Sequence, residues 1–422
     1  MRLRQLSAVL ALVALIAPVA CGSGKPTRRD DPIVSPNPTD PPVAIKRTAV
    51  DPKPLSDTIT KGLAWLASHQ LPTGGWGQGD EAGQLRANEK GTANVADTSM
   101  ALLAFLRAGN NPRTGKHMNT VQRGLEFVIS EIEASDKESL YVSSVRGTRV
   151  QSKIGEFADT FAALMMLTEA RDSMRDGVAN ARLDAALKKV VYKVEKNQRA
   201  NGSWDDKGWA PVLSQALAAK SLNRAAQSGT TVSKQVLDRV EAQAAGDEGE
   251  SGGAGVEIYG KSAKPSTMRD TAMRKKAKVE TMKKEAAKHK PQPLNQSPGG
   301  VPTAAEIAAA DKDADASVKA AVETERALIA RLDDPRFVSG FGNNGGEEFL
   351  SYLLISETLV QRGDDDWRKW DAAIGKLVDK VQNEDGSWTG HHCITGRTFC
   401  TAAALLVLMG DRTPAPTAVI AS

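Results

Sequence analysis

The fold of this chain is decided by the stretch Val381-Gln382-Asn383-Glu384-Asp385-Gly386-Ser387-Trp388. Its spacing, a Gln, three residues, a Gly, one residue and a Trp, occurs three times in the 422 residues. A spaced motif that recurs within one chain is typical of repeat architectures, in which each copy has the same structural role. The three copies consist of Gln70, Gly74 and Trp76; Gln198, Gly202 and Trp204; and Gln382, Gly386 and Trp388.

Each copy lies between two helical patterns and is expected to act as a clasp between them. Gly permits the positive φ at which a helix ends. The Gln amide can bond the free backbone groups of a helix end, and the Trp ring provides a flat apolar face with one N–H to satisfy. We interpret the motif as a structural device and not as a reactive one.

The helices on the two sides of a clasp differ in pattern. Before Gln198 and Gln382, apolar residues recur at helical spacing on one face. The segments 97–106, 159–167 and 401–409 are instead apolar on almost every side, which predicts burial on every side. Alternating striped and fully apolar helices predict an all-α fold of two layers, closed into a ring with the buried helices inside.

The three Gln-Gly-Trp sets resemble the QW motifs of the prenyltransferase and squalene cyclase repeat family. The resemblance covers residues 56–228 and 318–412, and it implies a single α/α toroid whose inner helices line a central, often apolar cavity. About five helical hairpins are expected, or six if the region between hides one. Residues 229–317 are rich in Ala, Lys, Glu, Gly and Pro, so we expect a long, charged, low-complexity and mostly disordered insertion there. The motif indicates a fold and not an activity.

The N-terminus has the pattern of a bacterial lipoprotein signal. A basic end, an apolar run and small residues make residues 1–20 a predicted signal peptide, and Cys21 after Ala20 resembles the acylated residue of a lipoprotein box. Residues 21–55 are Pro-rich and are expected to form a tether. These features predict an extracytoplasmic, membrane-anchored protein of the bacterial envelope, with Gly22 resembling the outer-membrane-sorted class. An ordinary secreted protein is the alternative.

Charge gives little indication of a partner. The net charge of +4 is too small to argue for nucleic acid. The stretch from Met273 to Lys290 is strongly basic, which either a solvated surface or a contact with anionic lipid would explain. The expected partner is therefore the membrane, reached through the lipid anchor.

His391, His392 and Cys393 form the most reactive-looking cluster, with Cys400 seven residues beyond Cys393. Three outcomes are open: a Cys393–Cys400 disulfide, as expected in an oxidising compartment; free buried thiols; or zinc bound by the two histidines and Cys393. The spacing matches no standard zinc finger, so the disulfide is preferred. No cofactor is expected, with zinc as the alternative.

The candidates for catalysis are Asp97, Asp159, Glu347 and His392. Asp97 and Asp159 stand at the start of inner helices, where a helix N-cap is the alternative role. Glu347 and Glu348 follow a Gly-rich loop and could act as acid and base, as in glycoside hydrolysis. Adjacent residues point in different directions, however, and the helix dipole alone favours negative charge at that position.

These patterns predict a non-enzymatic, membrane-anchored toroid that binds an apolar small molecule, a glycan or an envelope protein in its cavity or at its rim. The alternative is an enzyme of the terpene cyclase or prenyltransferase type, or a glycan-active one. Aromatic residues make up 5% of the chain, too few to line a cavity that stabilises carbocations. Converging carboxylates would favour the enzyme, and an interior filled by Leu, Met and Phe would favour the scaffold.

Overall fold

The structure is a computed structural model that describes residues 48–79, 91–204, 207–246, 256–288, 301–342 and 344–415. These stretches contain helices and no strand. None of the described helices is long and apolar enough to cross a lipid bilayer. The predicted signal peptide, Cys21 and most of the predicted tether lie outside the described residues.

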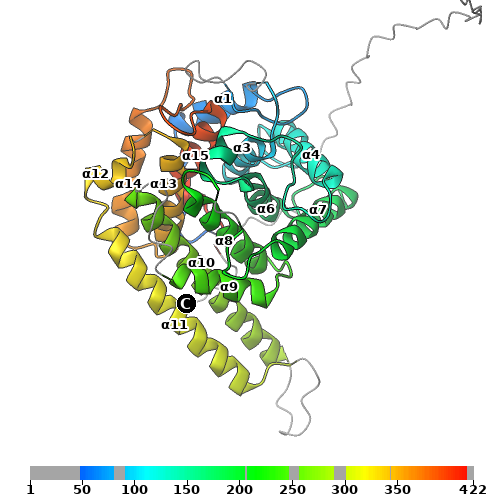
Figure 1. Cartoon of the computed structure of the whole chain (residues 1–422), viewed down its shortest axis with the longest axis vertical. Helices are drawn as coiled ribbons and strands as arrows, with labels where there is room; N and C mark the ends of the chain where they lie inside the picture. Colours follow the sequence, from blue (N-terminus) through cyan, green and yellow to red (C-terminus); the bar gives the residue numbers. More distant parts are fainter. Residues whose placement is uncertain are drawn as a thin grey trace, which may run out of the picture. The chain divides into compact units, whose positions relative to one another are not determined.

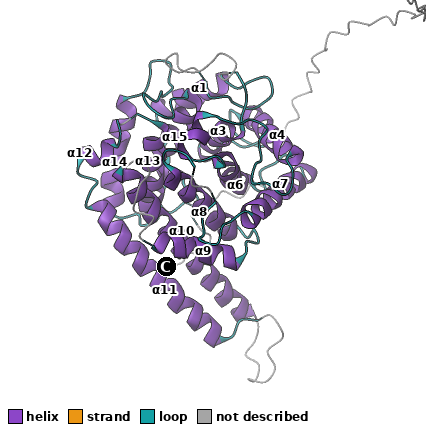
Figure 2. Ribbon diagram, in the orientation of Figure 1, coloured by secondary structure: helices purple, strands orange, loops and turns teal. Residues whose placement is uncertain are grey.

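Six of the described helices form a closed inner ring in which each helix packs against the next (Figure 1, Figure 2). Every residue of α6 and of α13 is buried, because neighbours, the outer layer and the ring interior cover an inner helix on all sides. α15 closes the ring against α3. The inner helices are α3 (Val95–Arg107), α6 (Ala158–Ala170), α8 (Pro211–Gln227), α10 (Glu257–Lys288), α13 (Gly346–Val360) and α15 (Arg397–Leu408).

Six further described helices surround this ring, and each precedes an inner helix in the sequence. Their buried residues fall on one face, as Trp367, Trp370, Ile374 and Val378 do in α14. The two layers confirm the all-α toroid that the sequence predicts. The outer helices are α1 (Asp57–Ser68), α4 (Met118–Ala134), α7 (Gly177–Lys196), α9 (Lys234–Ala245), α11 (Ala304–Ile329) and α14 (Asp365–Lys380). Short elements in the connections are α5 (Arg149–Ile154), α12 (Pro335–Ser339) and η3 (Gly410–Arg412).

The predicted disordered insertion at 229–317 is wrong for the residues described there. α9 and α10 form a fourth hairpin, and α11 begins the fifth, so the ring has six hairpins. The buried face of α10 includes small and polar residues such as Ser262, Ala263 and Thr267, so a hydrophobic count underestimates its burial. Ala, Lys and Glu are also strong helix formers. The composition that suggested disorder is therefore equally typical of a helix.

The described part of the basic stretch from Met273 to Lys290 lies beside acidic residues of α11. Lys276 lies 3.1 Å from Asp311 and 2.5 Å from Asp315, and Lys283 lies 3.2 Å from Asp311. Partly exposed pairs of this kind add little stability each, but they give α10 and α11 complementary surfaces. The described part of the stretch packs along α11 and is not an isolated basic arm.

The three clasps share one geometry at the end of an outer helix. Each Trp is buried, and its indole N–H donates to a backbone carbonyl ten residues earlier. This bond satisfies one of the free carbonyls at the end of the helix. The pairs are Trp76 with Leu66 O at 2.7 Å, Trp204 with Val194 O at 2.6 Å, and Trp388 with Val378 O at 2.9 Å.

Each clasp also connects its hairpin to the next outer helix. The Gln amide donates to the carbonyl of the clasp Gly and to a second carbonyl near the start of that helix. The second carbonyls belong to Thr120 for Gln70, Val236 for Gln198 and Thr58 for Gln382. The last of these bonds joins α14 to α1, so the third clasp closes the outer layer as well.

A buried cluster of charges occupies the ring towards the C-terminal ends of the inner helices. Arg107 of α3 lies 2.5 Å from Glu357 of α13 and 2.8 Å from Glu169 of α6. Lys220 of α8 lies 3.0 Å from the same Glu357. Because α15 lies between α3 and α13, and α10 between α8 and α13, these ion pairs cross the centre of the ring.

With Arg224 and Asp270, this central ion cluster contains three cations and three carboxylates. Burial disfavours the ionised form of Glu357, but Arg107, Lys220 and Arg224 outweigh that effect and hold its pKa below its usual value. A balanced set of hydrogen-bonded charges tolerates burial in a way that an isolated charge does not. The interior at this end is therefore filled by ions, unlike the apolar cavity that the resemblance implies.

Candidate functional site

The start of α13 and the loop before α15 enclose a second polar cluster. Gly346 N–H donates to Ile394 O at 3.0 Å, and Ile394 N–H donates back to Glu347 Oε2 at 3.2 Å. A Cβ added to Gly345 would lie 2.3 Å from Cε1 of His392, and one added to Gly346 would lie 2.6 Å from Ile394. The two glycines therefore allow the loop to lie directly on the start of the helix.

Both glutamates at this helix start face the loop. The Tyr259 hydroxyl of α10 donates to Glu348 Oε1 at 2.7 Å, and Phe341 N–H donates to the same oxygen at 2.9 Å. His392 Nε2 lies 3.2 Å from Glu348 Oε2. Glu347 and Glu348 are fully buried. The two glutamates have different partners, but the loop that crosses the helix start supplies a contact to each.

The pKa values of the two carboxyls are shifted in opposite directions. Burial raises the pKa of Glu347 to about 7, and backbone N–H donors offset only part of that effect. Burial also acts on Glu348, but the contact with His392 and the hydrogen bonds from Tyr259 and Phe341 N–H outweigh it and hold the pKa of Glu348 below its usual value. Burial lowers the pKa of His392, and the contact with Glu348 more than reverses this. Environments that separate the pKa values of neighbouring carboxyls are typical of sites that transfer protons.

Cys393 brings a thiol to the same place. Its φ of 50° lies in the left-handed region that residues other than Gly seldom adopt. Burial is the main cause and the nearby charge of Glu347 the second cause that raise the pKa of the thiol to about 11. One ligand atom each from Glu347, His392 and Cys393 lie within 4.8 Å of one another. Oxygen, nitrogen and sulfur donors of this kind can hold a divalent transition metal. His391, the other zinc candidate, is exposed and lies outside this group.

Three aromatic rings border the cluster. The ring centroid of Phe341 lies 5.6 Å from that of Trp209 and 5.0 Å from that of His392, and Trp209 lies 5.8 Å from Tyr259. Phe341 is 59% exposed, so it marks the side on which the cluster meets solvent. We use the term rim site for Tyr259, Phe341, Glu347, Glu348, His392 and Cys393.

Sequence reasoning did not identify the aromatic members of this site. Tyr259 is the one aromatic residue between positions 228 and 317, and it lies on the helix that was expected to be disordered. An isolated aromatic residue in a charged segment is the signal that could have found it. Phe341 stands in the Gly-rich loop before Glu347, and Trp209 stands just before α8.

The predicted Cys393–Cys400 disulfide is not formed in the structure. The Cys400 S–H donates to Ile394 O at 3.4 Å within the buried first turn of α15. Cys393 instead lies beside Glu347. Each thiol therefore has its own neighbour.

The N-cap interpretation of Asp97 and Asp159 is wrong, because each helix begins before its Asp. Asn94 caps α3, with its Oδ1 accepting from Asp97 N–H at 2.9 Å and its Nδ2 donating to Asp97 Oδ2 at 2.7 Å. Phe157 occupies the N-cap position of α6. Both Asp residues lie buried in the first turn.

Asp159 has a strongly perturbed carboxyl. Burial raises its pKa to about 6, although the nearby Gln151 side chain, the Ala96 backbone and the charge of Arg146 act in the opposite direction. None of these neighbours belongs to the rim site. Asp159 is therefore a separate titratable group on the inner ring.

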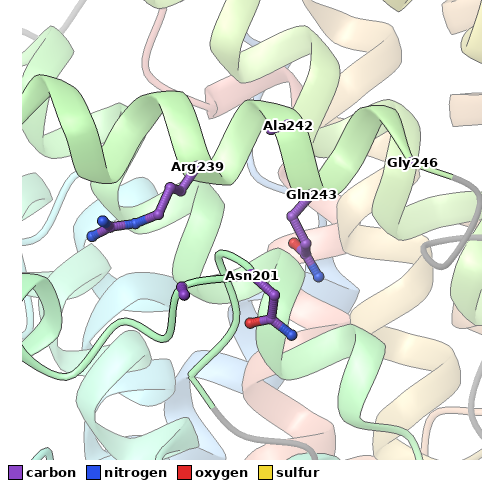
Figure 3. Close-up of a pocket in the computed structure, with 6 residues that line it drawn as sticks. Asn201, Arg239, Ala242, Gln243 and Gly246 are labelled. Atoms are coloured by element: carbon purple, nitrogen blue, oxygen red, sulfur yellow. The ribbon is translucent and has the colours of Figure 1, made fainter.

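A pocket of about 270 Å³ lies elsewhere, between the turn of the second clasp and α9 (Figure 3). Arg239 is the one charged residue in its lining, and its Nε donates to Gln198 Oε1 of the clasp at 2.7 Å. The pocket is lined by Ala200, Asn201, Arg239, Ala242, Gln243 and Gly246. It offers no acid–base group, and we assign no chemistry to it.

The fold and the site together define an all-α toroid with a buried carboxylate, histidine and thiol cluster at its rim. In comparisons with known proteins, no family matches the chain, and no curated protein matches it. A solved chain described as "a novel alpha-amylase from Clostridium perfringens" is similar over 85% of this chain and 99% of its own length, with 9% identity and a TM-score of 0.46. Likeness at this level carries no conclusion about activity, and the QW family remains a resemblance.

Proposed function

We propose that this chain is a membrane-anchored lipoprotein of the bacterial envelope whose toroid is a glycan-active enzyme. The observation that carries the proposal is the convergence of Glu347, Glu348 and His392 in one buried cluster that meets solvent beside Phe341. Positioned carboxyl and imidazole groups are what proton transfer in hydrolysis requires, and paired carboxyls are the groups that glycoside hydrolysis uses.

Two further features support a glycan as the substrate class. The predicted anchor at Cys21 would hold the toroid in the cell envelope, where polysaccharides are abundant. Trp209 and the exposed Phe341 present flat aromatic faces beside polar groups, a combination suited to a ligand with both apolar and hydroxyl-bearing faces. Carbocation chemistry is less well supported, because ion pairs of Arg107 and Glu357 fill the interior below the rim site.

A non-catalytic glycan-binding module is the second candidate. It is favoured by the complete burial of Glu347 and Glu348, which leaves Phe341 as the exposed part of the site. Such a module would use the aromatic face for binding and the glutamates to hold the loop in place.

Incubation of the purified full chain with envelope polysaccharides, followed by measurement of released reducing ends, tests the proposal. We expect cleavage that Glu348→Gln lowers by roughly 10²- to 10⁴-fold in kcat/KM. The exposed carboxylate variant Glu384→Gln is the matched control and should retain activity. Binding of a polysaccharide without cleavage by the native chain would favour the second candidate, and neither binding nor cleavage would refute both.

The anchor has its own test. Metabolic labelling with a clickable fatty acid should mark the native chain and leave Cys21→Ala unlabelled, and the variant should leave the membrane fraction. Equal labelling of both chains would show that Cys21 carries no lipid.

A further inference from the structure

We infer that the rim site is a binding site for a divalent transition metal, with zinc as the best fit, held by Glu347, His392 and Cys393. The inference rests on the proposed function in one respect, because it concerns the same site. The three ligand atoms lie within 4.8 Å of one another. Zinc binds O, N and S ligands at about 2.0–2.3 Å, which places ligands of one tetrahedral ion roughly 3.5 Å apart. A closure of about 1 Å would therefore bring this set to bonding distance.

Four buried polar atoms lack hydrogen-bond partners at this place. Among the described residues, Glu347 Oε1, Glu348 Oε2 and both ring nitrogens of His392 are shielded from solvent and unpaired. Buried polar atoms are nearly always paired, and an unpaired one suggests an unseen ion or water. A cation bound there would provide a partner for the Glu347 carboxyl and for a ring nitrogen of His392.

The outer contacts are those of a metal-binding histidine. Such a histidine usually has its second ring nitrogen held by a carboxylate, which fixes the ring and leaves the first nitrogen for the ion. Here Glu348 Oε2 lies 3.2 Å from His392 Nε2, and Glu348 is itself held by the Tyr259 hydroxyl and Phe341 N–H. With Nε2 beside Glu348, Nδ1 is the ring nitrogen of His392 that remains for an ion.

The backbone also favours a ligand role for Cys393. A φ of 50° is unfavourable for a residue with a side chain, and the glycines at 345 and 346 allow the loop to lie close against the start of α13. A carboxylate and a thiolate would together balance the charge of a divalent ion. Three protein ligands leave the fourth position of a tetrahedral ion for water or substrate, which is the arrangement of catalytic zinc sites.

Metal analysis and cobalt substitution of the detergent-extracted full chain test this inference. We expect one zinc per chain, and a thiolate-to-cobalt charge-transfer absorption after exchange with Co²⁺. Cys393→Ser should abolish that absorption, and Cys400→Ser, which removes the other cysteine among the described residues, should retain it. Glu348→Gln should weaken zinc affinity by roughly 10- to 100-fold, and His391→Ala should leave it unchanged.

Zinc content and cobalt absorption of the native chain test the inference even if a variant fails to fold. Absence of stoichiometric zinc together with absence of cobalt absorption would overturn the inference, and so would absorption that persists in Cys393→Ser. Zinc binding without any action on polysaccharides would refute the proposed function alone. Polysaccharide cleavage by a chain that binds no metal would refute this inference alone.

Discussion

Asp159 is a carboxyl whose protonated form the fold favours. Burial on the inner ring raises its pKa from 3.8 to about 6, so the folded chain binds this proton more tightly than the unfolded chain. The resulting stabilisation is fully present below the unfolded pKa and is lost as the pH rises through about 6. The difference between the two pKa values corresponds to about 3 kcal/mol.

We therefore predict that Asp159→Asn, which cannot ionise, gains stability relative to the native chain as the pH rises. In urea unfolding, the difference in free energy of unfolding between the variant and the native chain should shift in favour of the variant by about 2 kcal/mol from pH 4.5 to pH 7.5. The exposed variant Asp333→Asn is the control. The same pH trend in both variants would contradict a special role for Asp159.

Glu357 is the residue on which the central ion cluster depends. It contacts Arg107, Lys220 and Arg224 without any exposed surface. Removing one member of a buried ionic network leaves the others unpaired, which costs about 3–5 kcal/mol. We predict that Glu357→Gln lowers the free energy of unfolding by that amount in urea titrations. Glu384→Gln, at the surface, should change it by less than about 0.5 kcal/mol, and an equally small effect at Glu357 would show that the cluster is unimportant.

Sequence reasoning could identify single residues of the site but not their partners. Glu347 and His392 were candidates because their chemistry is visible in the sequence. The roles of Tyr259 and Phe341 depend on α10 and the 340–345 loop meeting at the start of α13, which no local pattern reveals. The charge of Glu357 within an apolar helix was equally visible, but its cationic partners lie on α3 and α8.

At the scale of elements, the clasp was the predictable part of the fold. The spacing of Gln, Gly and Trp is local, so the helix end, the positive φ and the buried indole follow from it. The bond from Gln382 to Thr58 could not be predicted, because it depends on the ring closing. The inner helix α10 was missed, since Ala, Ser and Thr bury it without the apolar run that marks α6 and α15.

The clasp glycine provides a test with a control on the same hairpin. Gly386 has a φ of 91°, and a Cβ there would lie 2.9 Å from the carbonyl oxygen of Lys61. We predict that Gly386→Ala destabilises the chain by more than about 1 kcal/mol. Gly375 lies within α14 where an added Cβ meets nothing within 4 Å, so Gly375→Ala should stabilise by about 0.5–1 kcal/mol. The midpoint temperature of thermal unfolding should fall for Gly386→Ala and rise for Gly375→Ala. Shifts of the same sign would contradict the structural role of the clasp glycine.

At the scale of the whole molecule, the question is whether α10 is part of the ring or an addition to it. The sequence predicted a mostly disordered insertion at 229–317. In the structure α10 packs between α8 and α13, and it carries Tyr259 of the rim site and Asp270 of the central ion cluster. Removing it would expose the buried flanks of two inner helices and leave Lys220 without Asp270.

We predict opposite outcomes for two deletions in this region. Deleting 234–317 should abolish soluble, cooperatively folded protein, because the ring cannot close without α9 and α10. Replacing 281–309 by a short Gly-Ser linker should leave thermal unfolding nearly unchanged, since the last buried residue of α10 is Val279 and the first of α11 is Ala314. Circular dichroism and soluble yield measure both outcomes. If the chain without 234–317 still unfolds cooperatively as a helical domain, five hairpins suffice. If replacing 281–309 abolishes cooperative unfolding, the end of α10 and the start of α11 are needed to hold the ring together.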